Sequence, residues 1–173
     1  MNTELFIQEA FYILGKTSNP HKISINAIIK KAGINRSTFY YYYQDKRDLI
    51  NKLQNEVLKT YFGILKKKSP HDAWITEHFG HFSFPEIYAN CHYVESNKET
   101  LKIWANDLEF INKFSEIMID YLKSYSKNET LCIFIAHGTI GYIRNWVNQQ
   151  DSVPSEEIAN NMIQMVKTVL ATE

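Results

Sequence analysis

The chain has 173 residues, of which 45% are hydrophobic and 14% aromatic, and its 19 basic and 19 acidic side chains give a formal net charge of zero. This length and composition are sufficient for a buried core in one large or two small domains. Only four Pro and six Gly argue against a β-rich fold, and no run reaches the roughly eighteen apolar residues that span a bilayer. Because residues 1–4 lack a signal-peptide pattern, we expect a cytoplasmic protein without membrane contacts.

The neutral total conceals an uneven distribution of charge along the chain. Residues 1–68 contain twelve Lys and Arg against five Asp and Glu, a net charge of +7, whereas residues 69–173 carry −7. Neutralisation of DNA phosphates requires a basic surface, and an acidic surface is repelled from DNA. We therefore expect a nucleic-acid contact, if the protein makes one, to lie within the first 68 residues.

A first helix is predicted from about residue 3 to residue 16, and the Asn19-Pro20 pair ends this segment. The side chains expected on its inward face are Phe6, Ala10, Ile13 and Leu14. A second helix is predicted to begin after Ser24, whose hydroxyl can accept a hydrogen bond from an early backbone N–H. Gly33 ends it, because glycine adopts a left-handed backbone without a Cβ clash, and Asn35 is placed to cap the next helix.

A third helix is predicted from Arg36, with Phe39 and Tyr43 four positions apart on its inward face. The side chains left on its outer face and flanks are Ser37, Thr38, Tyr40, Tyr41 and Tyr42. Hydroxyl groups in this position can bond base edges, and the Thr methyl can contact a thymine methyl. Two helices with this spacing are typical of a helix-turn-helix DNA reader. The alternative is simple packing of two helices, with tyrosines in the core and on the surface.

The chain also resembles the DNA-binding domain of the tetracycline-repressor (TetR) family over about residues 5–50. The signature residues of this resemblance lie between residues 32 and 50. The residues that carry this resemblance are Ala32-Gly33-Ile34-Asn35-Arg36-Ser37-Thr38-Phe39-Tyr40, Tyr43, Asp45-Lys46 and Leu49-Ile50. The resemblance implies phosphate contacts by Ser24, Tyr40 and Lys46. It implies contacts to base edges or adjacent backbone by Arg36, Ser37, Thr38, Tyr41 and Tyr42. We include Asn35, the cap of the same helix, in the predicted DNA-binding set.

Asp45 is predicted to open a long fourth helix that continues to the Lys66–Pro70 segment. The apolar stripe of this helix is Leu49, Leu53, Val57 and Ile64. We expect the helix to connect a helix-turn-helix DNA-binding domain (residues 1–48) to a helical regulatory and dimerisation domain (residues 49–173). The predicted fold class is therefore all-α.

Aromatic residues are concentrated between residues 74 and 114, with Gly80 and Pro85 among them, a pattern that favours short or kinked helices around a roomy interior. The candidate pocket residues are Trp74, His78, Phe82, Tyr88, His92, Trp104, Phe110 and Phe114. The alternative is that these side chains simply fill a helical core. The TetR resemblance favours a pocket, because such regulators commonly couple a ligand in the body to the separation of two DNA-reading heads. The effector itself is not identified by the sequence.

The last third of the chain is the predicted homodimer surface. Its candidate residues are Leu131, Phe134, Gly138, Gly141, Tyr142, Trp146, Met162, Met165 and Val169. Glycines let a second helix approach closely, and a tryptophan offers a large anchor. Residues 138–146 also resemble the short regulatory domain of a TetR subgroup that includes activators of dihydroxyacetone-kinase operons. The alternative is that these helices pack only within one chain.

Four histidines and a cysteine raise the question of a metal site: His71, His78, His81, His92 and Cys91. A third ligand at a fixed spacing is missing, so we predict neither a metal nor another cofactor. We also find no Gly-rich phosphate loop and no nucleophile paired with a base, and an enzyme is therefore a distant alternative. The sequence predicts a ligand-responsive repressor that binds double-stranded DNA as a homodimer. Its nearer rival is a similar regulator whose body binds a partner protein in place of a small molecule.

Overall fold

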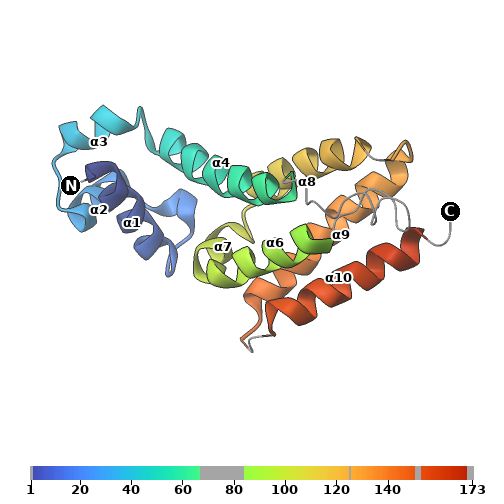
Figure 1. Ribbon diagram of the computed structural model, residues 1–173. Coiled ribbons are helices and arrows are strands. Elements are labelled where there is room, and N and C mark those ends of the chain that lie inside the picture. The colour runs from blue at the N-terminus through green and yellow to red at the C-terminus, as the bar shows by residue number, and fades with distance from the viewer. Residues whose placement is uncertain (1, 67–83, 125, 151–152, 171–173) are drawn as a thin grey trace.

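The computed structural model describes residues 2–66, 84–124, 126–150 and 153–170, and within them the regular structure is entirely helical (Figure 1). The predicted all-α fold class is therefore confirmed. No helix in these four ranges combines the length and the apolar character that a bilayer span needs.

The head of the molecule is formed by three helices and one short turn at one end of the elongated chain in Figure 1. These elements are α1 (Thr3–Gly15), the 3-10 turn η1 (Pro20–Lys22), α2 (Ile25–Ala32) and α3 (Arg36–Tyr42). The predicted caps are present. The Ser24 hydroxyl accepts a hydrogen bond from the Ala27 N–H at 3.1 Å, and the Asn35 side chain accepts one from the Thr38 N–H at 2.8 Å. Gly33 ends α2 with φ 66°, in the left-handed region.

The buried face of α1 differs from the prediction. Its buried residues are Ile7, Ala10 and Phe11, whereas Ile13 is 49% exposed. The reason is a tertiary contact, because the Phe11 ring stacks on Trp104 of the distant α7 with centroids 5.8 Å apart. The prediction was right for Ala10, which is buried, and for Leu14, which packs against the core, whereas Phe6 is half-buried and Ile13 is exposed.

Within the described residues, the body consists of α4, which leaves the head, and five further helices (Figure 1). They are α4 (Lys46–Leu65), α6 (Phe84–Ser96), α7 (Lys98–Trp104), α8 (Leu108–Lys123), α9 (Glu129–Asn148) and α10 (Ser155–Leu170). Helix α8 packs on α9, α10 on α6, and α6 on α4, while α7 contacts both α9 and α1. Helix α4 passes without a break through the predicted domain boundary at residues 48 and 49, and its Leu49, Leu53 and Val57 are buried as predicted.

Two glycine-to-alanine substitutions should change stability in opposite directions. Gly33→Ala places an L side chain at a positive φ, although nothing lies within 4 Å of the new Cβ, and should lower the free energy of unfolding by about 1–2 kcal/mol. Gly63→Ala lies in helix α4, again with nothing within 4 Å, and should raise it by about 0.5–1 kcal/mol. Urea unfolding of the two variants measures both effects, and equal signs would contradict the account.

Candidate nucleic-acid interface

The start of α3 is organised by one side-chain oxygen. Oδ1 of Asn35 accepts hydrogen bonds from the Thr38 hydroxyl at 2.8 Å and the Ser37 hydroxyl at 2.7 Å, in addition to the Thr38 N–H. Both hydroxyl hydrogens therefore point back toward the cap, and both hydroxyl oxygens retain acceptor capacity. Asn35 thus fixes the orientation of two predicted base-contacting side chains before any DNA arrives.

Arg36 connects α3 to α2. Its guanidinium donates to the side-chain oxygen of Asn26 at 2.9 Å and to the Tyr40 hydroxyl at 3.1 Å, and it lies 5.4 Å from the Tyr40 ring centroid. Tyr41 is the most exposed large apolar side chain of the head, at 81%, and its ring contacts Tyr42 edge-on. The exposed surface of α3 therefore consists of hydroxyl groups, aromatic rings and one cation, which suit contacts to base edges and phosphates.

Lys46 lies at the first position of α4, next to the head. The Asp45 side chain caps this helix by accepting from the Asp48 N–H at 2.8 Å. The Lys46 ammonium donates to the backbone carbonyl of His21 in η1 at 2.5 Å. A helix N-terminus and an ammonium group occur together here, which is a suitable arrangement for binding a phosphate.

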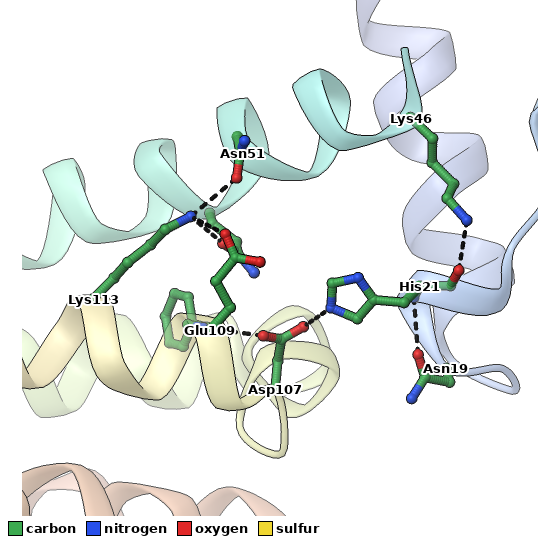
Figure 2. A network of polar contacts seen from close by, with 9 residues as sticks. Asn19, His21, Lys46, Asn51, Asp107, Glu109 and Lys113 are labelled. Atoms are coloured by element: carbon green, nitrogen blue, oxygen red, sulfur yellow. Dashed lines mark hydrogen bonds and ion pairs between the residues drawn. The ribbon is translucent and has the colours of Figure 1, made fainter.

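The same histidine connects the head to the body, as Figure 2 shows. His21 Nε2 lies 2.5 Å from Oδ2 of Asp107, whose side chain is only 2% exposed. The other oxygen of Asp107 accepts from the Phe110 N–H at 3.0 Å and so caps α8. Asp107 therefore fixes the beginning of α8 and holds η1 against it.

A second polar contact joins α8 to α4 in Figure 2. The Lys113 ammonium lies 3.0 Å from Oδ1 of Asn51, 2.9 Å from Oε1 of Gln54 and 3.0 Å from Oε1 of Glu109. Gln54 is fully buried. Sequence analysis identified neither this cluster nor the contact between His21 and Asp107, because their members are far apart in the chain. The only available sequence signal was Asp107 itself, in a typical helix-capping position.

The described members of the predicted pocket are divided between the core and the surface. Trp104 is fully buried against Phe11, and Phe110 and Phe114 are also core residues. Tyr88 is 37% exposed and bonds Asn160, and the His92 side chain is 77% exposed. Trp74, His78 and Phe82 lie outside the described residues. The aromatic side chains of α7 and α8 therefore fill the core, which was the alternative interpretation.

Three of the residues considered for a metal site, His71, His78 and His81, lie outside the described residues. Within the described part of the chain, no three His, Cys, Asp or Glu side chains are grouped to hold an ion. Burial raises the pKa of the Cys91 thiol to about 12, so this thiol is protonated at neutral pH.

The predicted dimer surface is partly exposed and partly buried. Phe134 on α9 is 67% exposed and Met165 on α10 is 54% exposed. A groove of about 160 Å³ lies between these helices, with Gly138, Tyr142 and Met162 in its wall. Of the other residues predicted for the dimer surface, Leu131 is half-buried and Gly141 is exposed. The side chain of Val169 is not among those described.

Trp146 does not occupy the predicted position on this face. It is only 2% exposed, and its indole N–H donates to the backbone carbonyl of Val153 at 2.9 Å. The residue therefore anchors the segment before α10 to α9 within one chain, and a partner subunit cannot reach its ring.

Two family models match the chain. One, described as bacterial regulatory proteins of the tetR family, matches residues 18–53, and one described as a transcriptional regulator C-terminal region matches residues 84–168. Together they cover more than two thirds of the sequence. No curated protein matches the chain.

Two solved structures share the fold. A TetR transcriptional regulator from Streptococcus agalactiae 2603V is 19% identical, with a TM-score of 0.70 over 95% of this chain and 93% of that one. The dihydroxyacetone kinase operon activator DhaS is also 19% identical, with a TM-score of 0.65 over 98% of this chain and 97% of that one. Both similarities extend over the head and the body together.

Replacement of Asp107 should reveal how much its cap of α8 contributes to stability. Asp107→Ala removes the cap of α8 and leaves the Phe110 N–H without its acceptor, and should lower the free energy of unfolding by about 1–2 kcal/mol. Asp107→Asn retains a good capping residue and should cost less. Urea unfolding is the measurement, with Asp120→Ala on the exposed face of α8 as the control, expected within about 0.5 kcal/mol of wild type. An equal loss in the Asp120 variant would contradict a specific role for Asp107.

Proposed function

We propose that this chain, which belongs to the TetR family of bacterial regulatory proteins, is a cytoplasmic regulator that binds a specific DNA sequence as a homodimer. The observation that carries the proposal is the exposed surface of α3. Asn35 orients the hydroxyls of Ser37 and Thr38 there, and Tyr41 projects into solvent beside them. This surface belongs to the basic part of the chain, where contact with phosphates is favourable.

The proposed contacts divide into two classes. Helix α3 enters the major groove, where Thr38 and Tyr41 meet base edges. Lys46, Tyr40 and Ser24 contact phosphates on either side of the groove. In such an arrangement the phosphate contacts set position and affinity, and the base contacts set sequence preference.

The dimer is proposed to form through the exposed face of α9 and α10. Phe134 and Met165 provide apolar area, and the exposed glycines at positions 138 and 141 permit close helix packing. A two-fold dimer places two α3 helices on successive major grooves, about 34–36 Å apart, on a pseudo-palindromic operator.

An effector is proposed to change the position of the head through the contacts that attach the head to the body. The head is attached by the continuous helix α4 and by the contact of His21 with Asp107 at the start of α8. A ligand that favours a different packing of α4 and α8 would change the separation of the two heads and lower operator affinity, as expected of a repressor. A body that binds a partner protein is the second candidate, favoured by the exposed Phe134 and Met165.

Tyr41→Ala should weaken specific binding because it removes a proposed base contact. We expect a loss of about 1–3 kcal/mol at the preferred sequence and little change on random DNA. Fluorescence anisotropy with a labelled duplex is the measurement, and Leu108→Ala, at an exposed apolar side chain of α8, is the control. Equal losses in both variants would exclude a reading role for Tyr41.

Lys46→Ala should act differently, because a phosphate contact does not depend on sequence. The same assay should show weaker binding to every duplex, with a salt slope shallower by about one unit. An unchanged salt slope would mean that Lys46 serves only its contact with the His21 carbonyl.

Phe134→Glu should disrupt the homodimer, because it places a charge in the proposed apolar interface. Sedimentation velocity should then detect monomers at concentrations at which the wild type is dimeric. Leu108→Glu is a matched control, because Leu108 is similarly exposed, at 71%, but lies at the start of α8. Monomers formed by the Leu108 variant alone would place the interface elsewhere.

A further inference from the structure

A small cavity lies inside the body where five helices meet. Its wall includes Leu65 of α4, Ile87 of α6, Met118 of α8, Ile135 of α9 and Met162 of α10. Its volume is about 60 Å³. None of the aromatic residues singled out by the sequence pattern contributes to the described part of this wall.

Asn90 on α6 is the unusual member of the lining. The residue is only 2% exposed, and within the described residues neither its Oδ1 nor its Nδ2 has a hydrogen-bond partner. A buried amide without partners destabilises a fold, and a leucine of similar size would not have this cost. Two unpaired polar atoms beside a cavity offer one acceptor and one donor to a molecule that enters it.

The rest of the described lining is uncharged. Its other polar groups are the hydroxyls of Tyr61, Tyr121 and Thr139 and the thiol of Cys91, and the Tyr121 hydroxyl already donates to the Leu65 carbonyl at 3.1 Å. Among these described lining residues an ionised ligand would lose its hydration without meeting an opposite charge. A neutral ligand with an apolar body has no such penalty.

We propose that this cavity binds a small uncharged molecule whose apolar part lies among the aliphatic side chains and whose hydrogen-bonding group pairs with the Asn90 amide. A primary carboxamide can pair with both Asn90 atoms at once, because it offers a donor and an acceptor side by side. The hydroxyl of a neutral alcohol can either donate to Oδ1 or accept from Nδ2. The binding itself follows from the site, whereas the role of the molecule as an effector rests on the proposed regulator function.

The size of a ligand that fits depends on the residues that separate the cavity from the groove between α9 and α10. The cavity and the groove between α9 and α10 share four residues, Ile135, Thr139, Met162 and Val166. The methionine side chain is unbranched and can adopt several rotamers, and the Met162 sulfur lies 3.8 Å from the Cys91 sulfur. A rotation of Met162 would connect the cavity of about 60 Å³ to the open groove of about 160 Å³. An enclosed space of roughly 150 Å³ accommodates benzene. A ligand of about six heavy atoms then fits, and it would lie directly beneath the proposed dimer face.

The test uses butanamide and butanoate, which have the same number of heavy atoms and differ in charge. Isothermal titration of the full chain should detect butanamide binding at millimolar concentration, and butanoate binding at least tenfold weaker. Asn90→Leu should weaken butanamide binding at least tenfold. Asn55→Leu, the same substitution at an exposed position of α4, should leave it within twofold of wild type.

Thermal unfolding of the free variants provides a second readout. Asn90→Leu should unfold at the same temperature as wild type or higher, because it removes an unpaired polar group. A lower temperature would mean that Asn90 already has a structural partner, which overturns the assignment. Equal binding of the two probes, no binding of butanamide, or unchanged binding by the Asn90 variant would also overturn it. DNA binding measured in the same samples tests the proposed function separately. If the wild type binds butanamide but no DNA, the proposed regulator function is wrong and the proposed ligand site stands.

Discussion

The position of the head depends on the contact between the turn joining α7 to α8 and the elements α1 and η1. On one side of this contact Trp104 stacks on Phe11, and on the other the buried carboxylate of Asp107 meets the ring of His21. The stacking supplies apolar burial, while the carboxylate specifies direction, because its second oxygen is already committed to the cap of α8. These two contacts together fix the head relative to the start of α8.

Two helices extend from this junction to the interior cavity. Helix α4 carries Lys46 beside the head and Leu65 at the cavity wall, about 30 Å away along a 20-residue helix. Helix α8 carries Asp107 at its cap and Met118 at the same cavity. The Lys113 ammonium joins the two helices between these ends through Asn51 and Gln54 of α4. Close packing favours movement of such a pair as a unit. The proposed response to an effector would use this path from the cavity to the head.

Features that depend on residues close together in the sequence were predicted correctly, whereas features that depend on distant residues were not. Ser24, Gly33 and Asn35 were assigned correctly because each acts within three residues of its own position. The body was harder, because an aromatic side chain has the same local signal in a core and in a pocket. Trp104 and Trp146 are both buried within the chain, the first through a partner 93 residues earlier and the second through the Val153 carbonyl. The cavity was missed for a related reason, since its most informative residue is an ordinary asparagine in a helix.

Two copies of α3 are proposed to read DNA together, and selection of bound sequences from a random DNA library shows whether they do. We expect enrichment of an inverted repeat whose half-site centres lie about one helical turn apart, 10–10.5 base pairs, or a multiple of this spacing. Enrichment of a single asymmetric site, or of no sequence at all, would contradict it.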